Sequence, residues 1–193
     1  MKKLVIAVAL VAILATGTVF ADHPDGWGIG LMGRGGYGWG ASDGSGGSSL
    51  GGGALSLKAP SLPVYWGINL DLSYRYFGAG VTGDFYLIDD NLIEQILGWY
   101  LGLGGFVGFS TWGAGSDYSW TSVSLGVRLP IGLSLQIPIS SIGLEVFLAV
   151  VPNLGIGFWF WDSKYDQHWK DNGRKNIGVV GGIGGELGFR IWF

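Results

Sequence analysis

The carboxy-terminal segment from Asn176 to Phe193 alternates, with a period of two, between apolar residues and small or charged ones. Most odd positions are apolar, while glycines, Glu186 and Arg190 occupy even positions. A period of two is that of a β-strand, in which successive side chains point to opposite faces. One face of this strand is therefore apolar, and the other is small or charged. Such a strand suits a transmembrane β-barrel, in which one face meets lipid and the other meets the lumen.

The amino-terminal segment has the pattern of a secretory signal peptide. Lys2 and Lys3 precede an apolar run from Leu4 to about Leu14, and Val19-Phe20-Ala21 provides small or tolerated residues at a cleavage point. We expect cleavage near Ala21, so that residues 1–21 are the signal peptide and 22–193 form one mature domain. The alternative, an uncleaved membrane anchor, fits less well because the apolar run has the length of a signal peptide.

The composition argues against several classes of protein. The chain contains 38 Gly and 10 Trp but only 13% charged residues, and its mean hydropathy is positive, which argues against disorder. Without Lys2 and Lys3, 9 of the 11 basic residues remain against 14 acidic ones, which predicts no binding to nucleic acid. The absence of Cys argues against a disulfide scaffold and against thiol chemistry. After the signal peptide, no apolar run is long enough for a transmembrane helix.

Eight segments carry the two-residue alternation, and eight is a common strand number for small outer-membrane barrels. Pro130 and Pro152 lie inside two of them, and a turn at either would raise the count toward ten. The alternation keeps its phase across both prolines, which favours bulges or local bends. We therefore predict an all-β fold, a transmembrane antiparallel up-and-down barrel of about eight strands, with ten as the alternative. The predicted strands are 27–39, 49–58, 64–77, 80–89, 97–109, 121–137, 142–161 and 176–193.

The connections between these strands differ in length. Residues 40–48, 110–120 and 162–175 form longer polar segments, which we expect on the outside as possible binding loops for extracellular ligands. Two connections depart from the simple pattern. We predict a tight turn at Gly78-Ala79, and a short helix through Ile96 that Asp90-Asn91 caps.

The same alternation predicts that charged side chains point into the lumen. An isolated charge in a narrow lumen is costly, whereas paired charges satisfy one another and fill the space. We expect Arg75 to approach Asp84 across the tight turn, and we expect Arg190 to lie near Glu145 and Arg34 near Glu186. The predicted lumen charge network comprises Arg34, Asp71, Arg75, Asp84, Arg128, Glu145, Glu186 and Arg190.

Aromatic residues gather near the ends of the predicted strands. Amphipathic rings favour the two membrane interfaces, so these positions predict aromatic girdles. The alternative is the Trp-rich core of a soluble sandwich. The predicted girdle residues are Trp39, Trp66, Trp99, Trp120, Phe158, Phe160 and Trp192.

Few residues offer catalytic or metal-binding chemistry. Gly28 to Gly33 match a dinucleotide fingerprint, but further glycines follow where a helix should begin. His23 lies near the expected mature amino terminus, where a solvated tail is favoured over a metal site. His168 lies close to Ser163 and acidic residues, yet no spacing supports a hydrolase like the barrel lipid-A deacylases. We predict no enzyme activity, cofactor or metal.

With these features together, residues 22–193 resemble the small eight-stranded outer-membrane proteins of the OmpA, OmpX and OmpW kind. The resemblance implies a place in the outer membrane of a diderm bacterium, with outer-membrane lipids as neighbours and no catalysis. It also implies that Phe189, Ile191 and Phe193 form the signal that the barrel-assembly machinery recognises. We expect a structural or surface-interaction role with a filled lumen. An OmpW-like narrow channel for small or hydrophobic solutes is the alternative, and a lipid-modifying enzyme is a weaker one.

Overall fold

The computed structural model describes most of the chain after the predicted signal peptide. The predicted signal peptide, the segment 162–175 and parts of the other predicted outer loops lie outside the described residues. The described residues are 24, 26–40, 46–73, 76–94, 96–113, 119–139, 142–161 and 176–193. Within these ranges, no helix combines the length and apolar character needed to cross a membrane.

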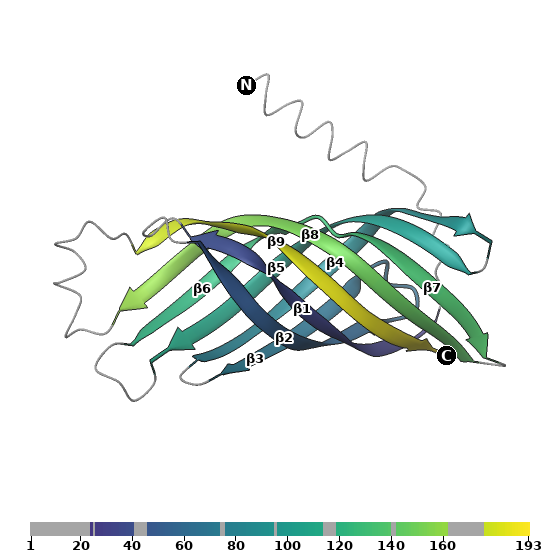
Figure 1. Cartoon of the computed structure of the whole chain (residues 1–193), viewed down its shortest axis with the longest axis horizontal. Helices are drawn as coiled ribbons and strands as arrows, with labels where there is room; N and C mark the ends of the chain where they lie inside the picture. The colour runs from purple at the N-terminus through teal and green to yellow at the C-terminus, as the bar shows by residue number, and fades with distance from the viewer. Residues whose placement is uncertain are drawn as a thin grey trace, which may run out of the picture.

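The described residues form one antiparallel sheet that closes on itself (Figure 1). β1 pairs with β2 on one side and with β9 on the other, and the pairing with β9 closes the ring. The strands are β1 (Gly28–Gly40), β2 (Gly46–Lys58), β3 (Tyr65–Ser73), β4 (Tyr76–Ile93), β5 (Leu97–Trp112), β6 (Trp120–Arg128), β7 (Ile131–Ile139), β8 (Ile142–Trp161) and β9 (Ile177–Trp192). The predicted antiparallel barrel is therefore confirmed, and a two-sheet sandwich is excluded because a single sheet closes.

β6 and β7 together occupy one place in the ring, between β5 and β8. Both pair with β5, and the pairs Trp112 with Trp120 and Leu101 with Ile131 belong to one continuous register. The same continuity holds toward β8. The ring thus has eight strand positions, which we call staves, and β6 and β7 share one of them. The predicted number of eight is confirmed, and the ten-stranded alternative is wrong.

Pro130 and Pro152 interrupt the hydrogen bonding between the end of β6 and the start of β7 without changing the register. Gly102 N donates to Pro130 O at 2.7 Å, and Leu129 N donates to Pro152 O at 2.9 Å. Each proline therefore keeps its acceptor in the ladder but lacks a donor. Neither proline is a bulge, because the pairing on both sides continues without a shift.

The tight turn differs in position from the prediction. Ser73 at the end of β3 pairs with Tyr76 at the start of β4, so Gly78 and Ala79 lie inside β4 and not in the turn. Asp84 consequently pairs with Tyr65. The alternation did not reveal this difference because a slip by an even number of residues leaves every side chain on its original face.

The predicted helix through Ile96 is also wrong. β4 continues through Asp90 to Ile93 and stays paired with β5, with irregularities of register after Tyr86 and after Asn91. Asn91 N donates to the Asp90 carboxylate at 2.8 Å. The Asp90 carboxylate thus accepts from the next residue of the strand and not from a residue two or three positions on, as a helix cap would.

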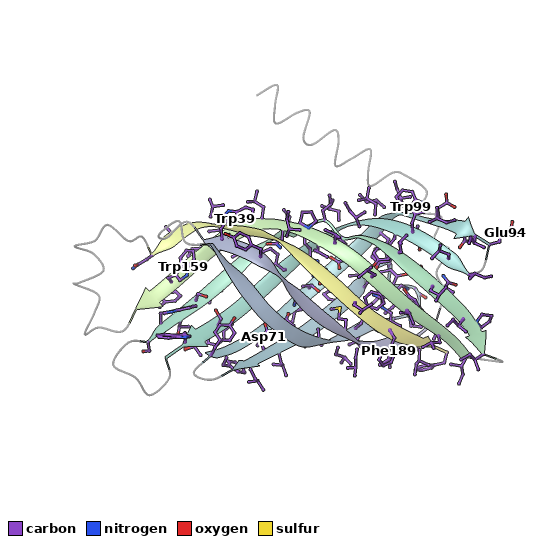
Figure 2. The ribbon with its side chains drawn as sticks, in the orientation of Figure 1. Trp39, Asp71, Glu94, Trp99, Trp159 and Phe189 are labelled. Atoms are coloured by element: carbon purple, nitrogen blue, oxygen red, sulfur yellow. The ribbon has the colours of Figure 1, made fainter. Side chains whose placement is uncertain are left out.

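The outer face of the barrel is apolar and the inner face carries charged side chains, as predicted. Large apolar side chains are exposed around the outside, among them Leu31, Ile183 and Leu187, whereas charged residues such as Arg190 and Glu145 are buried inside. Figure 2 shows side chains projecting from the outer surface along the whole length of the barrel. This is the reverse of a water-soluble protein and is typical of a barrel that stands in lipid.

Candidate functional site

The interior of the barrel is the candidate functional site, and it has two different halves. Toward the end where both β1 begins and β9 ends, charged and aromatic side chains pack closely. Toward the opposite end, the lumen contains a cavity. We call these the packed half and the cavity half.

Arg190 of β9 is the centre of the packed half. Its Nη1 lies 2.9 Å and 3.1 Å from the two Glu145 carboxylate oxygens, and its Nε donates to Ser56 Oγ at 2.8 Å. Its guanidinium carbon lies 4.1 Å from the ring centroid of Phe147 and 4.8 Å from that of Tyr65. The guanidinium is thus both hydrogen-bonded and covered by two rings, the arrangement that arginine favours when buried.

Trp192 also belongs to the packed half, and its predicted place in an aromatic girdle is wrong. Its side chain is only 3% exposed, and its Nε1 donates to Glu145 Oε2 at 2.9 Å. The physical reason is its even position on β9, which points inward like Glu186 and Arg190. The girdle prediction uses the position of Trp192 near the strand end and does not take into account the strand face to which its side chain points.

A stack of tyrosines lies on the inner wall of the packed half. The Tyr65 and Tyr86 rings are 3.9 Å apart at an interplanar angle of 9°, and the Tyr86 and Tyr100 rings are 4.4 Å apart at 10°. The stack begins at β3, and a Cβ on Gly132 of β7 would collide with the Tyr100 ring. The rings therefore extend along neighbouring strands from β3 to β7.

A second ionic cluster lies next to the cavity half. Arg128 contacts two carboxylates, with its Nε 3.0 Å from Asp84 Oδ1 and its Nη2 2.7 Å from Glu186 Oε2. Arg34 Nε lies 3.5 Å from Glu186 Oε1, and the Arg34 side chain is partly exposed to the cavity. This cluster balances two cations against two anions on four strands.

The structure brings together six of the eight residues of the predicted lumen network in these two clusters. The remaining two are Asp71, which lines the cavity and accepts a hydrogen bond from Asn69 at 3.5 Å, and Arg75, which lies outside the described residues. The expected approach of Arg75 to Asp84 used a register that is wrong, and Asp84 contacts Arg128 instead.

Sequence reasoning missed several buried interior residues. Lys58 and Asp89 are buried charges, and the tyrosine stack, Ser56 and Phe147 complete the packing. The alternation that placed Glu145 and Arg190 inside contains the same signal for Tyr65, Tyr86 and Tyr100. The prediction does not include these tyrosines because it assigns aromatic residues only to the girdles.

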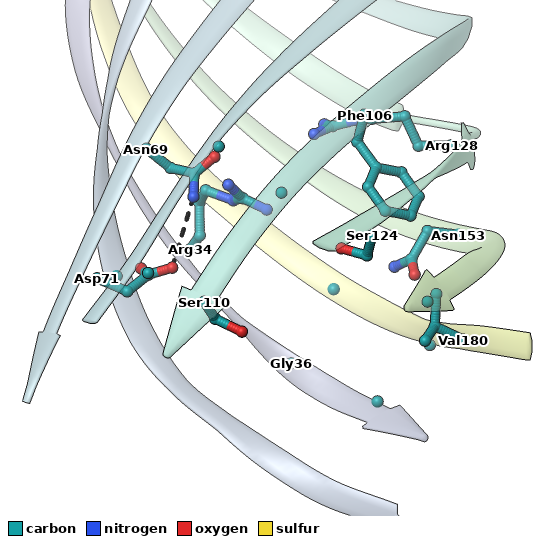
Figure 3. A pocket seen from close by; sticks show the side chains of 18 of the residues that line it. Arg34, Gly36, Asn69, Asp71, Phe106, Ser110, Ser124, Arg128, Asn153 and Val180 are labelled. Carbon is teal, nitrogen blue, oxygen red and sulfur yellow. Dashed lines mark hydrogen bonds between the residues drawn. The ribbon is translucent and has the colours of Figure 1, made fainter. Parts of the chain in front are cut away.

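The cavity half holds a space of about 660 Å³, a volume typical of small-molecule pockets. Figure 3 shows this cavity with Arg34, Asn69 and Asp71 on one side and Ser124 and Asn153 on another. Its wall includes Gly40, Tyr76 and Trp120, which lie at strand ends, so the cavity extends to the end of the barrel that faces the predicted outer loops.

The other predicted girdle residues differ in their placement. Trp39, Trp66 and Phe160 are exposed on the outside, and Trp99 and Phe158 are partly exposed. Trp120 instead lines the cavity, because its even position on β6 points inward. The predicted assembly-signal residues are all on the exposed face of the last strand or at its end: Phe189, Ile191 and Phe193.

The described part of the chain contains no group of three or more potential metal ligands of the His, Cys, Asp or Glu types. His23 and His168, which the sequence offers for metal binding or acid–base chemistry, both lie outside the described residues.

Comparisons with known proteins add a likeness of fold. No protein-family model matches the chain, and no curated protein matches it. A crystal structure of neisserial surface protein A is similar, with a TM-score of 0.46 and 11% sequence identity over 86% of this chain and 97% of that chain. The assignment of the fold depends on the strand pairing of the chain itself.

Proposed function

We propose that this protein is an integral barrel of a bacterial outer membrane with a structural or surface-interaction role. The observation that carries the proposal is the pairing of an apolar exterior with a lumen that charged and aromatic side chains pack in one half. The apolar outside matches lipid, and the packed half opposes the passage of solutes. The predicted outer loops 40–48, 110–120 and 162–175 are then the parts available for extracellular ligands.

The packed half is the main argument against a channel. The stacked tyrosines extend from β3 to β7, and Arg190 with its partners fills the adjacent space. A solute would have to separate these rings and break the contact between Arg190 and Glu145. Because separating a buried ion pair is costly, the proposal favours a closed barrel over an OmpW-like conduit.

Planar-bilayer conductance tests this proposal. We expect no steady open pore from the wild-type barrel, whereas a double variant with Tyr86→Ala and Tyr100→Ala should conduct because it lacks two rings of the stack. Heat-modifiable migration on a denaturing gel must first show that both proteins are folded. A steady current through the folded wild-type barrel would contradict the proposed role.

Membrane location has its own test, the fractionation of cells that express the full chain. We expect the protein in the outer-membrane fraction and at a size that fits loss of residues 1–21. Recovery from the soluble periplasmic fraction, without heat-modifiable migration, would refute the membrane assignment.

A further inference from the structure

Two glycines of the cavity wall border space that a side chain could enter. A Cβ on Gly184 would find its nearest neighbours at 3.6 Å, and a Cβ on Gly40 would find the Trp159 ring at 3.4 Å, which are ordinary contact distances. Other glycines of the same wall allow a close backbone approach, because a Cβ on Gly36 or Gly182 would lie 2.5 Å from a carbonyl oxygen of the neighbouring strand. At Gly184 and Gly40, therefore, the absence of a side chain keeps part of the cavity open.

The cavity wall offers neutral hydrogen-bonding groups on several strands. Hydroxyls come from Ser110, Ser122 and Ser124, and amides come from Asn69 and Asn153. Ser110 Oγ and Ser122 Oγ lie 2.8 Å apart in a hydrogen bond. Hydroxyl and amide groups include both donors and acceptors. Such a wall suits a ligand that itself carries many hydroxyl groups.

Among the described residues, the charges that line the cavity balance. They are Arg34 and Arg128 together with Asp71 and Glu186, and both arginines already contact Glu186. A phosphate or carboxylate ligand would meet the Asp71 carboxylate without a free excess of positive charge. The electrostatics of the cavity therefore favour an uncharged ligand.

Trp159 of β8 supplies an aromatic surface at the same cavity. A Cβ on Gly157 would lie 2.6 Å from its Cη2, and Gly40 and Val180 border the ring from β1 and β9. The indole therefore lies along the glycine wall of three neighbouring strands. In the ring order, β8 is opposite β3, which carries Asn69 and Asp71. Figure 2 places Trp159 near the end of the barrel away from Phe189.

From this wall we propose that the cavity is a binding site for an uncharged glycosyl group, a hexose unit of a sugar or of a glycolipid. The apolar face of the sugar ring packs on the Trp159 indole through dispersion contacts. Its hydroxyls bond with the serine and asparagine side chains, which have further donor and acceptor sites beside their contacts within the wall. This site deepens the proposed surface-interaction role because it names a class of ligand. Only the supply of the ligand as a glycolipid rests on the proposed membrane location.

The cavity opens past the strand ends. A free sugar would enter there from solution, and the head of a glycolipid would enter there from the adjacent bilayer leaflet.

A cysteine reporter tests the site, because the natural chain has no Cys. Gly184→Cys places a thiol on the cavity wall where a Cβ fits. The barrel is reconstituted in phosphatidylcholine vesicles, and the rate of thiol modification by a small methanethiosulfonate reagent is measured. The three samples contain maltose in solution, glucosyl-diacylglycerol in the vesicles, or neither. We expect a bound glycosyl group to slow the modification.

Protection by maltose would show that the site fills from solution, and protection by glucosyl-diacylglycerol alone would show that it fills from the bilayer. Trp159→Ala and, separately, Asn153→Leu should abolish the protection, while Trp66→Ala on the outer face, away from the cavity lining, should leave it unchanged. Heat-modifiable migration verifies that each variant is folded. Equal modification rates in all three samples, or protection that persists in Trp159→Ala, would overturn the proposal. Neither result would affect the conductance test of the closed barrel.

Discussion

Arg190 shows how a single buried charge is accommodated in this barrel. Its guanidinium lies between the rings of Phe147 and Tyr65, bonds with Ser56, and forms a two-point contact with Glu145. Removing one partner from such a buried pair leaves the other charge without compensation. The energetic importance of the pair is therefore clearest when only one member is changed.

We predict that Glu145→Gln destabilises the barrel by about 3 to 5 kcal/mol, the cost of leaving one member of a buried ion pair. Glutamine keeps the shape of the side chain but leaves Arg190 without a counter-charge. The measurement is urea unfolding of the barrel in lipid vesicles. The matched control is Glu94→Gln, because Glu94 is exposed and should change stability by less than about 0.5 kcal/mol. Equal effects of the two substitutions would contradict the interior role of Glu145.

Glycine has a different role in the packed half, where Gly132 accommodates the Tyr100 ring. Gly132→Ala should destabilise the barrel by about 1 to 3 kcal/mol, because the new methyl group overpacks the stack. Gly53→Ala is the matched control, since a Cβ there meets nothing within 4 Å. That control should be neutral or slightly stabilising. The same unfolding experiment compares both variants, and a larger effect at Gly53 would be evidence against the tyrosine stack.

The alternation predicts the face of an interior residue but not its partner. Asp84 is an example, because its inward position follows from the period of two, while its contact with Arg128 depends on the register of three strands. A slip by an even number of residues leaves the alternation unchanged. For this reason, the sequence was sufficient to place Asp84 in the lumen but led to the wrong partner, Arg75.

The stave formed by β6 and β7 shows that missing hydrogen bonds can divide a strand without a reversal of the chain. Pro130 and Val151 occupy opposing places in the continuous register, and Pro152 opposes Leu129. The two prolines thus remove donors at the same height of the barrel. The constant phase of the alternation correctly predicted that both segments belong to one stave.

Replacing Pro130 tests this description of the stave. Pro130→Ala supplies an N–H opposite Gly102, so the ladder gains a donor without a change of register. We expect the new backbone amide at position 130 to be protected from hydrogen exchange in NMR spectra, and we expect stability to change by no more than about 1.5 kcal/mol. The amides of Gly132 and Ser134 provide protected references in the same strand. Rapid exchange of the new amide, at the rate of an open turn, would contradict the continuous stave.

The barrel combines a packed end with a cavity. The packed half has buried arginines, carboxylates and tyrosines, and the cavity half has glycines, serines and amides. The sequence predicted closure and strand number because alternation extends over most of the chain. It did not predict the division into halves, because that depends on which inward residues from different strands lie at one height.

The apolar exterior yields a prediction that separates a membrane barrel from a water-soluble one. Leu187 lies on the outer face of β9, is 58% exposed, and pairs with Gly33 and Leu148 away from the strand ends. An arginine on the lipid face near the bilayer midplane costs about 2 to 4 kcal/mol, but near an interface it costs about 0 to 1 kcal/mol. In water, an exposed Leu187→Arg substitution would have little effect.

We therefore expect Leu187→Arg to lower the unfolding free energy in lipid vesicles by about 2 to 4 kcal/mol. Leu62→Arg is the control, because Leu62 is also exposed but lies in the connection between β2 and β3. It should cost no more than about 1 kcal/mol. A small, equal effect at both positions would mean that water surrounds Leu187. The difference between the two variants thus measures directly whether the middle of the barrel stands in hydrocarbon.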